Sequence, residues 1–147
     1  MAVKSHEVRL DELDHKILSE LRHNSRLTIR EIADRTRIRP STVHLRIQRL
    51  ISCMVIEKFT LKLNDKLIGQ DFIVFMFVNS SRDLPPSFFN DSKIKDAFGV
   101  TGEYDLILKL KFKDISEFNE YVINLRKRKE IVKTLTTVVT INIKEEL

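Results

Sequence analysis

The segment from residue 27 to residue 50 constrains the fold most, because it contains signals for two short helices joined by a tight turn. Thr28 is followed three residues later by Glu31, a capping-box pattern in which each side chain satisfies a free backbone N–H at a helix start. Pro40 suits the first position of a second helix, because its φ is fixed and it lacks an N–H. The segment therefore predicts a helix-turn-helix.

The second helix of this motif has an apolar face and a polar face. Val43, Ile47 and Leu50 recur at i, i+4 and i+7, so we expect them to enter a core. Hydroxyl and guanidinium groups dominate the polar positions, and near a helix N-terminus they suit phosphates and base edges of DNA. The predicted DNA-contacting residues, with two from the turn, are Arg37, Arg39, Ser41, Thr42, His44, Arg46 and Arg49. The alternative interpretation is a solvated basic helix face.

Positive charge is concentrated in the first part of the chain. Residues 1–64 contain 13 Lys and Arg against 8 Asp and Glu, whereas residues 65–147 contain 13 of each. All four histidines also precede residue 64. An excess confined to one module is typical of a protein that binds double-stranded DNA, which is a dense polyanion. The shift predicts a DNA-binding domain of residues 1–64 and a second domain of residues 65–147.

Several other classes of protein are disfavoured by the sequence. No apolar run approaches the ~20 residues that span a bilayer, and the N-terminal residues lack the apolar region of a secretory signal. We therefore expect a cytoplasmic protein with no membrane contact. Cys53 is the only cysteine, the three glycines form no phosphate-binding loop, and the histidines are too widely spaced for a metal site. No cofactor, metal or catalytic residue is expected.

Periodicity in the rest of the chain predicts the remaining elements. A helix is expected to begin at Asp11, with Leu13, Ile17, Leu18 and Leu21 on one face, and strict alternation over residues 55–63 predicts a strand or wing. Further strands are expected over residues 71–78, 98–101, 106–112 and 135–143, and helices over residues 87–94 and 114–125. The resulting order of the second domain is βαββαβ. The predicted fold class is α+β: a winged-helix-like domain followed by a ferredoxin-like domain.

Two segments resemble the feast/famine regulators of the leucine-responsive, or Lrp/AsnC, family. The segment LDELDHKILSELRHNSRLTIREIADRTRIRPSTVHLRIQRL resembles that family's DNA-binding head, in which an LDxxDxxIL opening precedes the helix-turn-helix. The segment TGEYDLILKLKFKD, followed about 20 residues later by KTLTTVVTI, resembles its effector domain, with a GxYD loop and a Thr-rich last strand. Together the two segments make the resemblance span the chain.

The resemblance implies a transcriptional regulator that binds double-stranded DNA as a homodimer or as an octamer assembled from dimers, and that is modulated by an amino acid bound near the GxYD loop. The effector-binding residues implied in this way are Gly102, Tyr104, Asp105, Thr134, Thr136 and Thr137. Their chemistry suits an amino acid, because a carboxylate accepts from an ammonium while hydroxyls donate to a carboxylate. The alternative is that Tyr104 simply packs and Asp105 closes a turn.

The chain departs from the family pattern in the turn of its DNA-binding motif. Where the family commonly has a glycine and then a serine that caps the second helix, this chain has Arg37 and Arg39.

Two other functions stay open. One is an effector-free architectural protein that coats DNA. The other is an enzyme similar to the tetrapyrrole decarboxylases with this domain layout, although its site would need a histidine, which the C-terminal half lacks.

Overall fold

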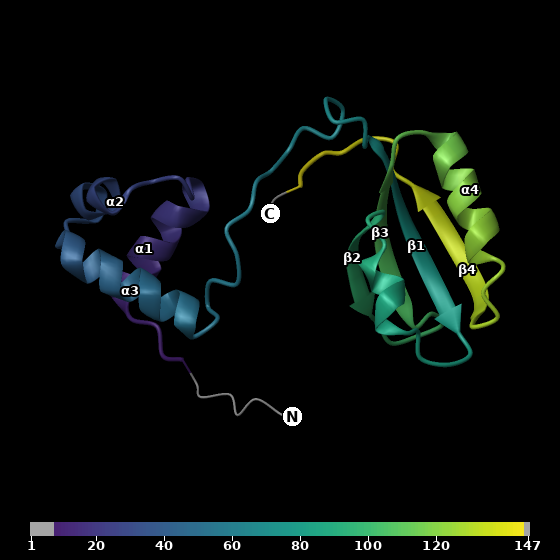
Figure 1. The fold of residues 1–147 in the computed structure, drawn as a ribbon, viewed down its shortest axis with the longest axis horizontal. Coiled ribbons are helices and arrows are strands. Elements are labelled where there is room, and N and C mark those ends of the chain that lie inside the picture. The colour runs from purple at the N-terminus through teal and green to yellow at the C-terminus, as the bar shows by residue number, and fades with distance from the viewer. Residues whose placement is uncertain (1–7, 146–147) are drawn as a thin grey trace. The chain divides into compact units, whose positions relative to one another are not determined.

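The computed structural model describes residues 8–145 and divides the chain into two compact units between Leu61 and Lys62. The first unit contains the helices α1 (Glu12–His23), α2 (Ile29–Thr36) and α3 (Pro40–Ser52). The second contains β1 (Phe72–Ser80), the 3-10 helix η1 (Pro86–Asn90), β2 (Ile94–Gly99), β3 (Leu106–Phe112), α4 (Ile115–Leu125) and β4 (Ile131–Val138). Figure 1 labels the helices and strands along the chain. None of the helices described is long and apolar enough to cross a membrane.

The three helices of the first unit are fixed by caps and by a shared core. The capping box at α2 is confirmed, because Glu31 N–H donates to Thr28 Oγ1 and Thr28 N–H donates to Glu31 Oε2. A second capping box joins Asp11 and Asp14 at the start of α1. The buried side chains that these helices share, together with one from the turn before α3, are Ile17, Leu21, Ile32, Ala33, Ile38, Val43 and Ile47.

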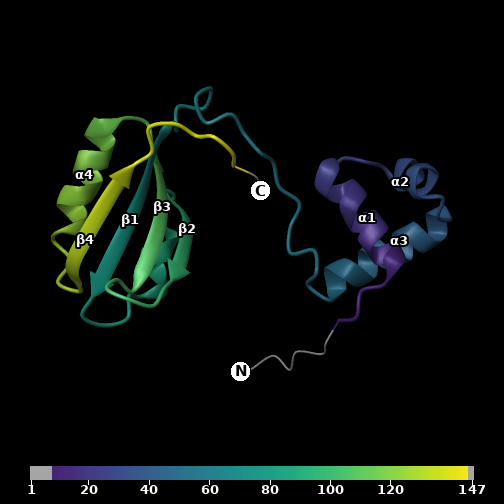
Figure 2. The ribbon, with the colours of Figure 1, turned by 180° about the vertical axis from the view of Figure 1, so that it is seen from behind.

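The second unit is an antiparallel four-stranded sheet with helices on one face. Its strand order is β2-β3-β1-β4, which places the first and third strands at the centre. Figure 1 views the sheet from the side of η1, and Figure 2 views it from the opposite side, where no helix covers the strands. Inward-facing side chains of β1 and β3 alternate along the strands and pack with Phe88 of η1 and Leu125 of α4. The predicted α+β class and the βαββαβ order are confirmed.

Four predictions about individual elements are wrong. Residues 55–63 form no regular strand, and residues 139–143 also lie outside any strand because β4 ends at Val138. Alternation makes a segment amphipathic, but a strand also needs a hydrogen-bonding neighbour. Residues 55–63 pair with no strand within residues 8–145, and the single bond from the Val139 N–H to the Ile73 carbonyl is too little to extend β4. β2 begins at Ile94, earlier than expected, and the first helix of the domain is only a short 3-10 turn that follows Pro85.

Candidate nucleic-acid interface and effector loop

The turn between α2 and α3 presents two cations beside an uncapped helix start. Arg37 ends α2 with a φ of 57°, in the left-handed region where a side chain is disfavoured and glycine is commonest. Arg39 precedes Pro40 and makes no side-chain bond to the first N–H groups of α3. Both arginines are exposed, and neither forms an ion pair with any residue from 8 to 145. Two free cations at a helix N-terminus favour the binding of an anion such as phosphate.

The outer face of α3 carries a line of exposed side chains. The predicted inner face is confirmed, since Val43 and Leu50 are fully buried and Ile47 is nearly so. Opposite to it, the exposed positions follow the helical spacing i, i+3, i+4 and i+7 and therefore form one line. We call this line the exposed stripe; its residues are Ser41, His44, Leu45 and Gln48. Thr42 is half-buried beside it.

Arg46 and Arg49 lie to one side of the exposed stripe and bind the start of α1. Arg46 Nη1 lies 2.6 Å from Asp11 Oδ1 and 2.9 Å from Asp14 Oδ1. Arg49 Nη1 lies 3.1 Å from Asp14 Oδ2, and its Nη2 donates to the backbone carbonyl of Arg9 at 3.0 Å. These bonds, which we call the Asp14 cluster, join residues 9–14 to the C-terminal half of α3.

The Asp14 cluster turns Arg46 toward α1, against the expectation that it faces outward, whereas Arg49 stays exposed while it bonds to Asp14. Asp14 is fully buried, and a buried carboxylate is costly unless cations and hydrogen-bond donors pair with it. The hydrogen bond from Arg46, followed by the bond from the Asp14 N–H, lowers the pKa of Asp11 to about 2. The Arg46 side chain is only 22% exposed, and that of Arg49 is 44% exposed but tied at both guanidinium ends. These arginines hold α3 against α1.

Gln48 is the residue of this surface that the sequence prediction missed. It sits seven positions after Ser41, so the helical period alone places it on the same stripe. The prediction of DNA contacts was based on positive charge, so it included Arg46 and Arg49 and omitted this neutral amide. An amide can bond bidentately to adenine, and an exposed apolar group such as Leu45, which is 68% exposed, can contact the thymine methyl.

The GxYD loop joins β2 to β3 and is tied to the end of β1. Gly102 has a φ of 131°, a conformation that favours glycine. The Asp105 N–H donates to the Val78 carbonyl at 3.0 Å, and Asp105 Oδ2 accepts from the Ser80 N–H at 2.8 Å. One carboxylate oxygen thus closes the turn, as the alternative interpretation held. The other oxygen, Oδ1, accepts no hydrogen bond from residues 8–145.

Tyr104 packs on the face of the sheet that carries no helix. Its ring centroid lies 5.7 Å from that of Phe77, and Lys133 Nζ lies 5.3 Å from the Tyr104 ring centroid. Lys133 also pairs with Glu103, whose hydrogen bond is the main cause that raises the pKa of this lysine. The sequence prediction missed Lys133, although its place beside the Thr-rich strand was visible. It brings a cation to the loop, where a ligand carboxylate would need one.

The three threonines of β4 do not lie on one face. Thr134 pairs with Val78 and Thr136 pairs with Met76, so both hydroxyls share the helix-covered face with those buried side chains. Thr137 pairs with Phe75 and therefore points to the opposite face. Because Asp105 N–H bonds to Val78, Thr134 is the threonine nearest in register to the GxYD loop. Thr134 is therefore close to the loop along the strand, but its side chain lies on the face opposite that of Tyr104, and Thr137 lies on the face opposite that of Thr134 and Thr136.

The chain is similar to known proteins over nearly its whole length. A model described as the AsnC-type helix-turn-helix domain matches residues 10–51, and one described as the Lrp/AsnC ligand binding domain matches residues 92–147. An uncharacterised HTH-type transcriptional regulator of Pyrococcus abyssi is 36% identical over 141 residues, which cover 93% of this chain and 96% of that protein. A second such regulator, from Pyrococcus horikoshii, is 34% identical over 95% of this chain and 97% of its own.

Solved structures share the same fold. The structure of AsnC from E. coli is 24% identical, has a TM-score of 0.85, and matches over 95% of this chain and 97% of its own. A transcriptional regulator of Neisseria meningitidis is also 24% identical, with a TM-score of 0.87 over 94% of each chain. Both domain models and a near-full-length relative at 36% identity therefore agree that this chain belongs to the Lrp/AsnC family of transcriptional regulators.

Proposed function

We propose that this regulator reads DNA with the exposed stripe of α3 and anchors on phosphates with Arg37 and Arg39. The observation that carries the proposal is the division of the motif's cations. Two of them are bound in the Asp14 cluster, while the two in the turn are exposed beside the helix start. A recognition helix enters the major groove with its N-terminal residues toward the bases, which is where Ser41, His44 and Leu45 lie.

The second part of the proposal is that an amino acid binds at the GxYD loop. The open Oδ1 of Asp105 suits a ligand ammonium, and Lys133, which lies over the Tyr104 ring, suits a ligand carboxylate. Two proteins of the same fold support this reading by their ligands. The Neisseria regulator was solved as a complex with L-methionine, and so was a feast or famine regulatory protein of Mycobacterium tuberculosis.

A third part concerns assembly, for which we propose a homodimer formed through the helix-free face of the sheet. Large apolar side chains are exposed there, including Phe75, Phe98 and Leu135, which are 36%, 56% and 49% exposed. Soluble monomers rarely leave such a group of side chains open to water. A dimer with two-fold symmetry would present two copies of α3 to half-sites about one helical turn apart, or a multiple of that spacing.

Fluorescence anisotropy tests the proposal on DNA from upstream of the protein's own gene and on a scrambled duplex of equal length. Each titration is run across a salt series, with and without a pool of amino acids. Tighter binding to the upstream duplex that changes with the pool is the expected result. Equal, salt-sensitive binding to both duplexes would instead favour an architectural DNA-coating protein, and no binding to either would contradict the proposal.

A further inference from the structure

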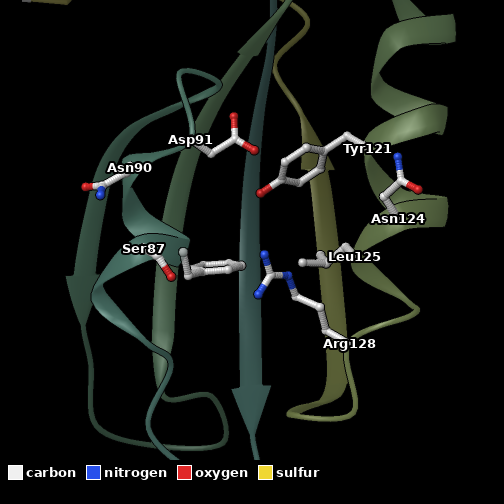
Figure 3. Close-up of a pocket in the computed structure, with 8 residues that line it drawn as sticks. Ser87, Asn90, Asp91, Tyr121, Asn124, Leu125 and Arg128 are labelled. Carbon is white, nitrogen blue, oxygen red and sulfur yellow. The ribbon is translucent and has the colours of Figure 1, made fainter.

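A pocket of about 440 Å³ opens between η1 and α4, on the helix-covered face of the sheet and away from the GxYD loop. Figure 3 shows the side chains that line it. Phe88 and Leu125 supply apolar surface, while Asp91, Tyr121 and Arg128 supply polar groups. Its volume is within the range of pockets that hold small molecules in proteins. We propose that this pocket is a second ligand site, which binds an α-amino acid with an apolar side chain.

Two opposite charges face this pocket without neutralising each other. Asp91 Oδ1 accepts from the Lys93 N–H at 2.9 Å, which fixes the carboxylate, but neither Asp91 nor Arg128 forms an ion pair with any residue in the described range 8–145. Neighbouring cations, unlike Arg128, do form ion pairs: Arg82 pairs with Glu130, and Lys93 pairs with Glu117. Figure 3 shows the Asp91 carboxylate and the Arg128 guanidinium both turned into the pocket.

Tyr121 adds a hydrogen-bond donor between the two charges. In Figure 3 its hydroxyl points into the pocket between Asp91 and Arg128. Burial, and then the charge of Asp91, raise the pKa of Tyr121 to about 12, so the hydroxyl keeps its proton at neutral pH. Its ring packs edge-on against Phe112, which fixes the direction of the hydroxyl. The geometry thus holds an acceptor, a donor and a cation at separate points of one wall.

The chemistry of the wall selects a zwitterion. Asp91 suits an ammonium, and Arg128 presents a planar fork that matches a carboxylate. The Arg128 guanidinium already rests over the Phe88 ring, 5.2 Å from its centroid, so it is positioned before a ligand arrives. The aromatic ring and Leu125 would contact the ligand's side chain, which therefore should be apolar. The inference uses none of the loop residues and stands independently of the proposed effector site.

Isothermal titration calorimetry of the full chain with L-leucine, L-methionine and L-phenylalanine tests this site. Asp91→Asn keeps the bond to Lys93 N–H but removes the charge, and Arg128→Gln removes the fork. The titration of the unaltered protein should show two binding steps, one for each proposed site. We expect each variant to weaken the affinity of at least one of these steps tenfold or more. The matched control is Arg126→Gln, a nearby arginine outside the pocket lining, which should leave both steps unchanged. Asp105→Ala separates the two sites, since it should remove only the step that belongs to the GxYD loop.

Analogues of leucine provide the chemical test. 4-Methylpentanoate lacks the ammonium and 3-methylbutylamine lacks the carboxylate, so each should bind the Asp105→Ala protein at least tenfold more weakly than leucine. The proposal is wrong if none of the three amino acids binds the Asp105→Ala protein. It is also wrong if Asp91→Asn and Arg128→Gln both bind all three amino acids as the unaltered protein does.

Discussion

The arginines of the helix-turn-helix divide into two regions that differ in what they touch. At the C-terminal half of α3, Arg46 and Arg49 bind the buried carboxylate of Asp14. At the turn before α3, Arg37 and Arg39 are exposed and have no acidic partner within the described residues. A charge count treats all four alike. Whether a cation is available to DNA therefore depends on its acidic neighbours.

The largest effect should come from breaking the Asp14 cluster. Arg46→Ala combined with Arg49→Ala would leave a fully buried carboxylate without its cations, which typically costs about 3–5 kcal/mol. Urea denaturation followed by circular dichroism should show that loss in the free energy of unfolding. A variant as stable as the original protein but unable to bind DNA would return both arginines to the DNA-contacting set.

The next effect should come from the exposed stripe. Gln48→Ala removes an exposed amide and no internal hydrogen bond, so we expect the preference for an operator over scrambled DNA to fall by about 1–3 kcal/mol. Anisotropy titrations on both duplexes measure this preference. Ser52→Ala, at the far end of the same helix, is the matched control and should leave the preference intact. An equal loss on both duplexes would make Gln48 a backbone contact.

A uniform effect is expected from the exposed arginines of the turn. Arg37→Gln with Arg39→Gln should weaken binding to specific and scrambled DNA to the same extent, because phosphate contacts carry no sequence information. The slope of log K against log salt should become shallower by about 2, close to one counterion per lost contact. Thermal unfolding should be unchanged. If the slope stays the same, these two side chains do not reach phosphates.

The smallest effect concerns the left-handed backbone of Arg37 and Met54, both at a φ of 57°. Glycine relieves this conformation, so Arg37→Gly and Met54→Gly should each raise the free energy of unfolding by about 1 kcal/mol. Only Arg37→Gly should also weaken DNA binding, which makes Met54→Gly its control. Equal DNA affinity in both variants would mean that the Arg37 side chain does not contact DNA. The left-handed backbone at Arg37 would then need an explanation other than DNA binding.

Local chemistry made much of the helical unit predictable. The Thr28–Glu31 cap and the buried face formed by Val43, Ile47 and Leu50 depend on residues close in sequence, and the structure contains both. The destination of Arg46 was not predictable in this way, because its partners Asp11 and Asp14 are more than 30 residues away. The helical periodicity of α3 does not show which side of the helix packs against α1.

The same division applies to the second unit. The alternation of Leu106, Leu108, Leu110 and Phe112 predicted β3 correctly, because a strand between two others shows its buried face in the sequence. Residues 55–63 alternate just as clearly but lie in no strand. The GxYD loop was found by its motif, whereas Lys133 lies some 30 residues away and contacts Tyr104 only through folding.

The bond from Arg49 to the Arg9 carbonyl ties α3 to the backbone ahead of the first helix. A carbonyl cannot be altered by substituting its side chain, so this contact is sensitive to the path of the backbone instead. Removing the chain up to and including Arg9, or fusing a bulky tag immediately before Arg9, would weaken the hydrogen bond that the Arg49 guanidinium makes there. The C-terminal end of α3 would then be held less firmly. The choice of where to place a purification tag on this protein is therefore also a choice about the rigidity of α3, the helix that we propose reads DNA.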